Sequence, residues 1–356
     1  GTWYFARNRS KYDGLFSENC ERLLMENKNE HPPVNFGKTG VLIINLGTPD
    51  STSWWDIRKY LKEFLSDRRV IELNPFIWQI ILNLFILTFR PSKTAHAYKK
   101  IWMKETNQSP LMYFTVNQAK KLSDVLGSEK LIVDFAMRYG NPSIKSKLKS
   151  LKEAGCENII ILPLYPQYAA ATTATVCDEV YRSLMKMRWQ PSLQIIPHYE
   201  SEPLYIDALV NSIEKKVKEI SWKPDLIISS YHGIPKSYFD KGDPYHCYCH
   251  KTTRLIKEKF NKIEIQTTFQ SRFGPQEWLT PYTDKTLETL PDKGVKNLLV
   301  ICPGFASDCV ETLEEINIQG RESFIEKGGE NFDLIPCLND NSDHIKLFQK
   351  LIGKYL

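Results

Sequence analysis

Eight short apolar runs, separated by polar or amphipathic stretches, constrain the fold of this 356-residue chain most strongly. The runs are rich in Val, Ile and Leu and are continuous rather than alternating, as expected of parallel strands covered on both faces. Lysine-rich amphipathic stretches such as 143–154 and 203–219 lie between them and predict helices. The chain is therefore expected to be an α/β protein with doubly wound sheets. The predicted strands are 41–46, 131–136, 158–164, 193–197, 225–230, 264–269, 297–303 and 332–336.

A short internal repeat predicts two similar domains. Residues 136–140 (Ala-Met-Arg-Tyr-Gly) resemble 270–274 (Gln-Ser-Arg-Phe-Gly), and 161–163 resemble 301–303 at a similar offset. The first half has a much longer segment before its Arg-aromatic-Gly turn, which indicates an insertion. We expect an N-terminal extension or remnant presequence at 1–38, a first domain at 39–216, a second at 217–337 and a C-terminal helix within 338–356 that packs back on the first domain.

The predicted insertion contains a nearly uninterrupted apolar run at 75–89 (PFIWQIILNLFILTF). A helix that spans a bilayer needs about 20 such residues, so this run is too short to cross a membrane. Two interpretations remain open. The run is either a buried core helix or an exposed apolar lip, within about 74–98, that touches a bilayer or an apolar ligand.

Composition and motifs exclude several other classes of function. The net charge is only +5 and no Lys/Arg-rich run occurs, so a nucleic-acid partner is not expected. Neither G-x-G-x-x-G after a strand nor G-x-x-x-x-G-K-[ST] occurs, which argues against nucleotide binding. The eight cysteines are scattered, as in a reducing compartment. Residues 1–38 lack the apolar core of a secretory signal, so secretion is not expected.

His232 lies just past the carboxyl end of a predicted parallel strand, where open α/β sheets bind their ligands. A single histidine in such a place is often structural. A Gly-Asp-Pro-Tyr turn ten residues later and an acidic segment after another strand favour a functional role instead.

The acidic segment is 302–316, and it also follows a predicted strand directly. On a helix Asp308, Glu311 and Glu315 would form one stripe, because they are spaced i, i+3 and i+7. Carboxylates on one face can bind a cation and transfer protons. The alternative is a capping box made by Asp308 and Glu311 at the start of the helix.

Several motifs resemble those of the ferrochelatase family and occur in the same order along the chain. The passage 226–245 matches the family signature, in which an apolar run leads to Ser-x-His-Gly-aliphatic-Pro and then to Gly-Asp-Pro-Tyr. The Pro-Gly-Phe turn and Ser-Asp-x-x-Glu-Thr-Leu helix at 303–313 are similar to a second hallmark. The resemblance covers about residues 40–340 and is greatest to proteobacterial members. Further similar motifs are Leu42 to Pro49, Ser109-Pro110-Leu111, Met137-Arg138-Tyr139 and Leu164 to Tyr168.

The resemblance implies two similar Rossmann-like domains with an active cleft between them, and a lyase that inserts Fe²⁺ into protoporphyrin IX to complete haem biosynthesis. His232 would bind the iron or accept a pyrrole proton. Glu311 would lie opposite, with Asp308 and Glu315 continuing an acidic path. The porphyrin contacts that the resemblance implies are Arg90, Tyr98, Ser109, Arg138, Tyr139 and Tyr168.

The same resemblance implies that Fe²⁺ is a substrate and that no organic cofactor is needed. A [2Fe–2S] cluster is not expected, because the tail 346–356 has no cysteine. The segment 246–250 (His-Cys-Tyr-Cys-His) is expected to be an ordinary loop rather than a cluster or zinc site, since Cys-x-Cys is not the usual zinc spacing. The expected partners are protoporphyrin IX and, through 75–89, a membrane surface. The surface would be the cytoplasmic face of a bacterial membrane or the matrix side of the mitochondrial inner membrane, and the chain would be a monomer or a homodimer.

Two other functions fit the same residues. One is a related chelatase for another metal or porphyrin, which the long apolar lip argues against, because it suits a hydrophobic, dicarboxylate porphyrin. The other is a carrier that holds haem without making it. A carrier needs only one axial ligand, so the presence of both His232 and Glu311 favours an enzyme.

Overall fold

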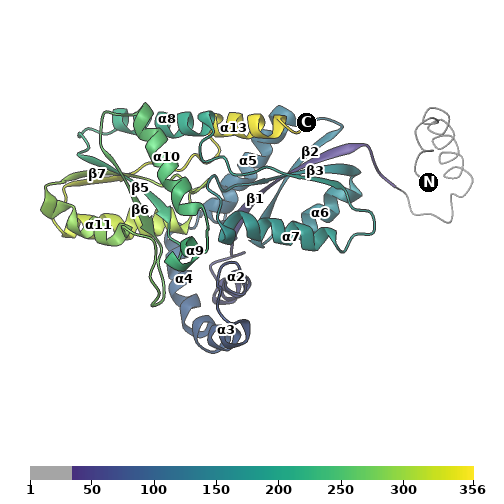
Figure 1. Cartoon of the computed structure of the whole chain (residues 1–356), viewed down its shortest axis with the longest axis horizontal. Coiled ribbons are helices and arrows are strands. Elements are labelled where there is room, and N and C mark those ends of the chain that lie inside the picture. Colours follow the sequence, from purple (N-terminus) through teal and green to yellow (C-terminus); the bar gives the residue numbers. More distant parts are fainter. Residues whose placement is uncertain (1–33) are drawn as a thin grey trace, which may run out of the picture.

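The computed structural model describes residues 34–356, so almost all of the predicted N-terminal extension lies outside the described residues. Within them, two four-stranded parallel sheets form the centre of the molecule (Figure 1). Their strand orders, β2-β1-β3-β4 and β6-β5-β7-β8, are equivalent. The α/β class and the two similar sheets are thus confirmed. The strands are β1 (Lys38–Thr48), β2 (Leu131–Gly140), β3 (Cys156–Pro163), β4 (Ser192–Ile195), β5 (Leu226–His232), β6 (Ile265–Gln270), β7 (Asn297–Ile301) and β8 (Asn331–Leu334).

The continuous apolar character of the strands follows from burial on both faces. Along β1, Val41 and Ile43 belong to one apolar cluster, whereas Leu42 and Ile44 belong to another on the opposite face. All four side chains are fully buried. Because neighbouring residues of a strand point to opposite faces, only an unbroken apolar run satisfies both layers.

Helices cover both faces of each sheet. One large cluster is formed by α5, α8, α10 and α13 over one face of both sheets, and it joins the two sheets into one body. The opposite faces are covered by α6 and α7 on the first sheet and by α11 and α12 on the second. These helices are α5 (Pro110–Leu126), α6 (Ile144–Glu153), α7 (Thr175–Leu184), α8 (Pro203–Glu219), α10 (Tyr245–Lys259), α11 (Thr283–Thr289), α12 (Arg321–Glu326) and α13 (Ser342–Gly353).

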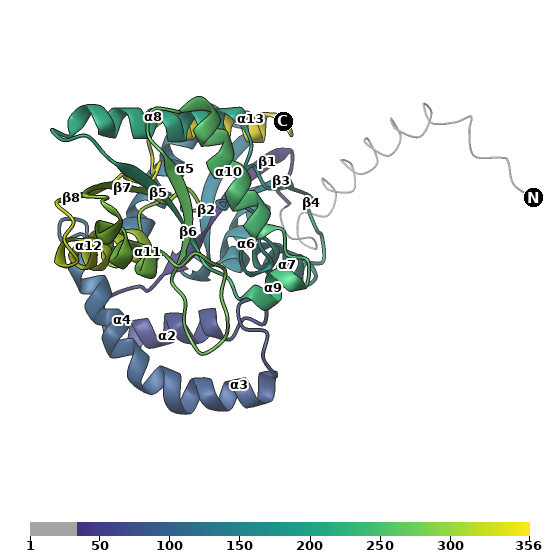
Figure 2. The same ribbon diagram turned by 60° about the vertical axis from the view of Figure 1, so that its left-hand side comes forward.

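The insertion after β1 forms a helical arm that projects from the first sheet (Figures 1 and 2). The lip is continuously helical because Asn74 caps its start, with its side chain 3.1 Å from the amide of Phe76, and Pro75 occupies the first turn. The arm comprises α2 (Trp54–Leu65), α3 (Pro75–Ile81), the π-helix η1 (Leu82–Ile86) and α4 (Leu87–Ile101).

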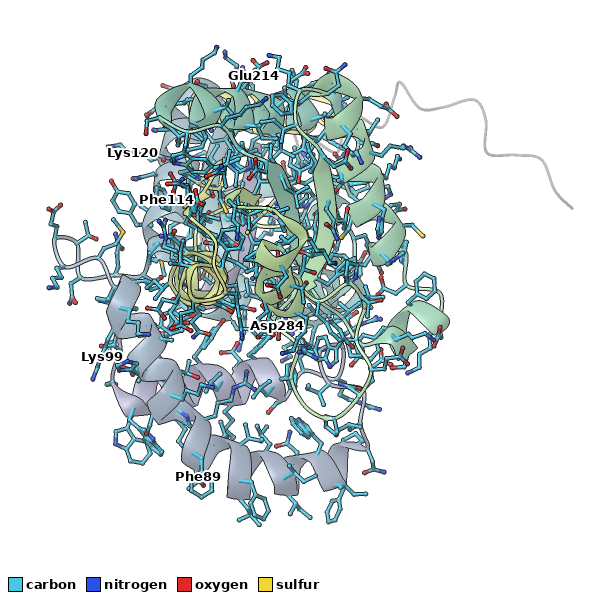
Figure 3. All side chains as sticks on the ribbon, turned by 90° about the vertical axis from the view of Figure 1, so that its left-hand side faces the viewer. Phe89, Lys99, Phe114, Lys120, Glu214 and Asp284 are labelled. Atoms are coloured by element: carbon cyan, nitrogen blue, oxygen red, sulfur yellow. The ribbon has the colours of Figure 1, made fainter. Side chains whose placement is uncertain are left out.

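The outer side of this arm is apolar and exposed. Phe76 and Phe89 are 78% and 73% exposed, whereas Leu82 and Leu87 turn inward and are fully buried. Phe89 points away from the body of the molecule in Figure 3. The run 75–89 is therefore an exposed lip, and the interpretation as a buried core helix is wrong. No helix of the described part of the chain is long and apolar enough to cross a membrane.

Candidate active site

The predicted site residues of the second half come from the carboxyl ends of adjacent strands. His232 is the last residue of β5, Ser271 follows β6 directly, and the acidic segment follows β7. β5 lies between β6 and β7 in the sheet. The shared edge of three parallel strands therefore positions these groups, as the strand pattern predicted for His232.

The imidazole of His232 has a fixed orientation. Its Nδ1 lies 2.7 Å from the carbonyl oxygen of Gly233, which can only accept, so Nδ1 carries the proton and Nε2 keeps its lone pair in the neutral ring. Gly233 is required here, because a Cβ at this position would lie 2.9 Å from the carbonyl oxygen of Gln270. The half-buried ring can thus present Nε2 as a base or metal ligand.

From Glu311 onward the acidic segment lies in a ten-residue π-helix, η4 (Glu311–Gly320). π-helices are rare, usually last one turn and are frequent at functional sites. Within residues 34–356 two shorter ones occur, η1 in the lip and η2 (Ala170–Ala174) after β3. The i→i+5 hydrogen bonding widens the turn, and Glu311 and Glu315 still lie about one turn apart on one face.

Glu315 is held by the residues that follow β6. The Ser271 amide donates to Oε1 at 2.7 Å, and the Ser271 hydroxyl donates to Oε2 at 2.5 Å. Gln270 Nε2 donates to the carbonyl oxygen of Glu311 at 2.8 Å, which anchors the first turn of η4. Ser271 has a φ of +67°, a region that non-glycine residues seldom occupy and that is common at functional sites.

His232, Glu311 and Glu315 share one electrostatic environment. Burial raises the pKa of Glu315, and the neighbouring charge of Glu311 raises it further. Hydrogen bonds from Ser271 and the charge of His232 oppose this shift. A carboxyl group with a raised pKa beside an imidazole is suited to accept and release protons near neutral pH.

Asp308 does not belong to the predicted stripe. It precedes the helix, because η4 begins at Glu311, and its carboxylate accepts hydrogen bonds from Thr312 Oγ1 at 3.0 Å and Asn339 Nδ2 at 2.7 Å. The cap residue Val310 has no side-chain capping bond, so the capping box is also wrong. The expected i, i+3, i+7 stripe fails because the helix starts later than its sequence suggests, and Asp308 anchors the preceding turn instead.

Residues of the insertion, together with Tyr165 after β3, share the electrostatic environment of Glu311. Burial lowers the pKa of Arg90 on α4, and the negative charge of Glu311 partly offsets that shift. Burial raises the pKa of Tyr60, Tyr98 and Tyr165, and the charge of Glu311 raises each of them further. Sequence reasoning predicted Arg90 and Tyr98 but missed Tyr60 and Tyr165. Tyr165 stands in a motif noted above, whereas nothing in the sequence marks Tyr60.

Arg90 also contacts the loop after β6, because its guanidinium carbon lies 5.2 Å from the centre of the Phe273 ring. Phe273 packs against the apolar cluster of the insertion, against which Trp78 of the lip also packs. This loop thus joins the second sheet to the arm of the first. Sequence reasoning used Phe273 only as part of the repeat and missed its place at the site.

Arg138 and Tyr139 form a separate buried network. The guanidinium of Arg138 pairs with Asp67, and the Tyr139 hydroxyl donates to the same carboxylate at 2.9 Å. Burial acts to raise the pKa of Asp67, but hydrogen bonds from Thr175 and the Arg69 amide and the charge of Arg138 hold it below its usual value. Tyr139 is fully buried. Asp67 and Thr175 had no signal in the sequence that pointed to this network.

The remaining predicted porphyrin contacts lie apart. Ser109 is buried and caps α5, accepting from the Met112 amide at 3.1 Å. It lines a cavity of about 580 Å³ with Thr48, Trp102 and Asn141. Tyr168 is half-buried on the connection after β3. The structure therefore brings together His232, Glu311, Glu315, Arg90 and Tyr98, whereas Ser109, Tyr168 and the Arg138–Tyr139 pair have other surroundings.

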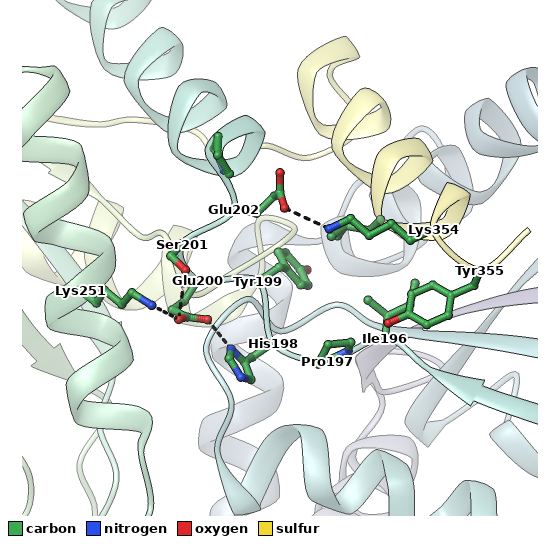
Figure 4. Close-up of a pocket in the computed structure, with 12 residues that line it drawn as sticks. Ile196, Pro197, His198, Tyr199, Glu200, Ser201, Glu202, Lys251, Lys354 and Tyr355 are labelled. Atoms are coloured by element: carbon green, nitrogen blue, oxygen red, sulfur yellow. Dashed lines mark hydrogen bonds and ion pairs between the residues drawn. The ribbon is translucent and has the colours of Figure 1, made fainter.

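Another concavity, of about 230 Å³, is shown in Figure 4. Its central group is the buried Glu200, whose carboxylate lies 2.5 Å from His198 Nδ1 and 2.9 Å from Lys251 Nζ. None of the predicted site residues lines it. Its charged groups pair with one another, so the functional argument rests on His232 and η4.

The grouping of one imidazole with a free Nε2 and two carboxylates suits two tasks. Imidazole and carboxylate ligands bind borderline divalent ions such as Fe²⁺ and Zn²⁺, and the same groups remove protons from a bound molecule. Among residues 34–356, no three His, Cys, Asp or Glu side chains form a ready metal-binding cluster.

Solved structures of chelatases share the fold. SirB from Bacillus subtilis with Fe³⁺ aligns with a TM-score of 0.55 at 10% identity, over 89% of this chain and 95% of that chain. The sirohydrochlorin chelatase SirB from Bacillus subtilis subspecies spizizenii, in complex with cobalt, aligns with a TM-score of 0.53 at 9% identity. The alignment covers 89% of this chain and 94% of that chain. At such identities the likeness shows the fold alone.

Sequence comparison identifies the family. The Allorhizobium ampelinum ferrochelatase is 54% identical over 331 residues, covering 92% of this chain and 96% of that protein. The Rhizobium meliloti ferrochelatase is 53% identical over 335 residues, covering 93% of this chain and 99% of that protein. The sequence profile described as ferrochelatase matches residues 38–356. The chain therefore belongs to the ferrochelatase family.

Proposed function

We propose that this protein is a ferrochelatase, a lyase that inserts Fe²⁺ into protoporphyrin IX to form protohaem and releases two protons. The observation that carries this proposal is the edge of the second sheet, where His232 keeps Nε2 free beside the η4 carboxylates. The strong family match supports the same activity.

Metallation requires that the two pyrrole protons leave and that iron loses its water ligands. In this proposal His232 and Glu311 share the tasks of binding the incoming iron and accepting pyrrole protons. Glu315 passes protons onward, since its raised pKa lets it take a proton and its hydrogen bonds to Ser271 stabilise the ionised form. The iron is a substrate throughout.

The porphyrin would lie between η4 and the insertion. Arg90 and Tyr98 are the predicted contacts nearest Glu311, and Arg90 suits a propionate at the rim of an apolar slot. Ser109, Arg138, Tyr139 and Tyr168 remain proposed contacts. In the described conformation Ser109 and Tyr139 are buried, so their hydroxyls would reach a porphyrin only after local rearrangement.

We also propose that the apolar lip 75–89 rests on a membrane surface. Its exposed aromatic and aliphatic side chains present an apolar face of the kind that interfacial helices insert among lipid headgroups. A lip that reaches the bilayer would give a hydrophobic porphyrin a short path from the membrane to the site.

Two domains, 39–216 and 217–337, are proposed to provide the two walls of the porphyrin cleft. Each range contains one of the parallel sheets. The segment 338–356 is proposed to pack back on the first domain, and the contacts of α13 with α5 and α8 support this.

Porphyrin metallation can be followed directly by absorption. The protein is incubated anaerobically with protoporphyrin IX and Fe²⁺, or Zn²⁺ as a surrogate, and the change from free-base to metalloporphyrin spectrum is recorded. His232→Ala and Glu311→Gln should each abolish turnover above the protein-free blank. Glu322→Gln, at an exposed position on α12, is the matched control and should retain the parent rate. Tight porphyrin binding without metallation in the parent protein would favour the haem-carrier alternative.

A further inference from the structure

The segment 246–250 is helical rather than the loop expected from the sequence. It lies in the first turns of α10, which runs over Tyr245–Lys259. His246 and His250 are spaced i, i+4 and therefore lie on one face of the helix. The centres of their rings are 4.4 Å apart, with planes inclined by 51°. The fold thus brings two imidazoles side by side outside the site described above.

The surroundings of the pair hold the rings without occupying their nitrogens. The His246 ring lies 5.7 Å from the Phe269 ring and 5.2 Å from the Phe239 ring, and the His250 ring lies 6.0 Å from Phe269. Contacts of this kind restrict ring rotation but leave the lone pairs free. Neither imidazole has a hydrogen-bond partner in the part of the chain that the structure describes.

The two cysteines of the segment do not form a chelating pair. Cys249 is fully buried in the apolar cluster with Tyr245, whereas Cys247 is exposed. Two residues apart on a helix, these side chains point in different directions. The geometry therefore agrees with the sequence-based expectation that Cys247 and Cys249 do not form a metal site. The flanking histidines, which that expectation did not consider, lie side by side.

The protonation state also favours ligand binding. Burial lowers the pKa of both His246 and His250, and the proximity of His246 lowers that of His250 further. The lowered pKa favours the neutral form of both imidazoles, which is the form that binds metal ions.

We propose that His246 and His250 form a second, surface metal site for a divalent transition ion, coordinated through one nitrogen of each imidazole. Imidazole suits Zn²⁺, Cu²⁺, Ni²⁺ and Fe²⁺ rather than Mg²⁺ or Ca²⁺. Metal–nitrogen bonds of about 2 Å need the two nitrogens to lie about 3 Å apart, which small ring rotations allow at the observed ring separation. Water fills the other positions, so the ion exchanges readily. This site is independent of the chelatase proposal.

Metal stoichiometry tests the site on the full chain. Equilibrium dialysis with Zn²⁺ at pH 7.5, without porphyrin, counts bound ions for the parent, His246→Ala and His250→Gln. Each variant should lose one equivalent and keep the parent's circular dichroism spectrum. The matched control is His96→Ala, since His96 is a single exposed histidine on α4, and it should keep the full count.

Active-site binding is separated by a further variant. His232→Ala should lose any equivalent held at η4 yet retain the one at α10, whereas His246→Ala should metallate porphyrin at the parent rate. Cu²⁺ electron paramagnetic resonance of the His232→Ala protein should show two nitrogen ligands. An unchanged count in His246→Ala and His250→Gln overturns the proposal. So does a loss of that equivalent in Cys247→Ser with retention in His250→Gln.

Discussion

At the scale of single residues, a few hydrogen bonds stabilise the ionised forms of buried carboxyl groups. Glu315 is kept ionisable by Ser271, which donates through both its amide and its hydroxyl. Asp67 is kept ionised by Arg138 and Thr175. In each case the partner lowers the pKa of the carboxyl against the effect of burial. Loss of a partner should therefore alter protonation at Glu315 and stability at Asp67.

We expect Ser271→Ala to slow turnover and to shift its pH dependence. A lost hydrogen bond to a charged group is worth roughly 1.5–3 kcal/mol, so kcat should fall at least about tenfold. The pKa of Glu315 should rise further, which moves the acidic limb of the kcat–pH profile to higher pH. Ser271→Gly should show the same pH shift with equal or greater thermal stability, because glycine relieves the positive φ. An unchanged pH profile in both variants would show that Ser271 has no role in tuning Glu315.

Arg138→Leu should destabilise the fold strongly. It leaves the Asp67 carboxylate without its buried cation, a change that costs roughly 3–5 kcal/mol in comparable pairs. Arg182→Leu is the control, since Arg182 and Glu179 form an exposed pair expected to contribute less than about 1 kcal/mol. Urea denaturation measures both, and equal losses in the two variants would contradict the buried-pair argument.

At the scale of elements, the lip and the π-helix are connected. Lys100, in the last turn of α4, pairs with the buried Glu314 of η4 at 3.1 Å. Arg90 of the same helix lies near Glu311. The arm that carries the exposed apolar surface is thus fixed to the helix that carries the carboxylates, so movement of one element would be transmitted to the other.

The double variant Phe85→Asp/Phe89→Asp should weaken membrane association without unfolding the protein. Both side chains are more than half exposed, so their replacement removes little buried surface. Cosedimentation with anionic phospholipid vesicles should fall several-fold, while the unfolding midpoint changes little. Tyr181→Asp, at a half-exposed position on α7, should sediment like the parent. Equal binding of the double variant and the parent would contradict the proposed contact through the lip.

At the scale of the whole molecule, the turn that contains Asn339 connects the C-terminal helix α13 to the rest of the protein. The Asn339 side chain bonds Asp308, with its Nδ2 2.7 Å from Oδ2. The Asn339 carbonyl accepts from Gln118 on α5 at 2.8 Å and lies 2.7 Å from Nδ1 of His344 on α13. Residues far apart in the sequence thus meet at a buried polar junction, which includes the imidazole of His344.

Protonation of His344 should destabilise the fold in acid. Burial lowers its pKa from 6.5 to about 4 in the folded state. The unfolded chain therefore binds the additional proton first, so stability is lost as the pH falls from about 6.5 to about 4. A shift of one pKa unit corresponds to about 1.4 kcal/mol, so the loss of stability approaches roughly 3 kcal/mol. Urea denaturation of the parent and His344→Gln across this range isolates the effect, and parallel pH curves would contradict it.

The sequence by itself determined the strands and the position of His232. A strand buried on both faces needs an unbroken apolar run, and that requirement is local, so β1 and β5 were predicted from their own residues. Whether 75–89 is core or surface was left open, because an apolar helix has the same composition in either place. Only the tertiary structure shows that no other element of residues 34–356 covers its outer face.

The composition of the site was decided by tertiary contacts. Asp308 was predicted in the stripe because a regular helix was assumed, but η4 starts at Glu311 and Asp308 is held by Thr312 and Asn339 instead. Tyr60 and Tyr165 come from distant segments and meet Glu311 only after folding. Sequence spacing specifies which side chains share an element, whereas burial and contacts between elements specify which of them share a charge environment.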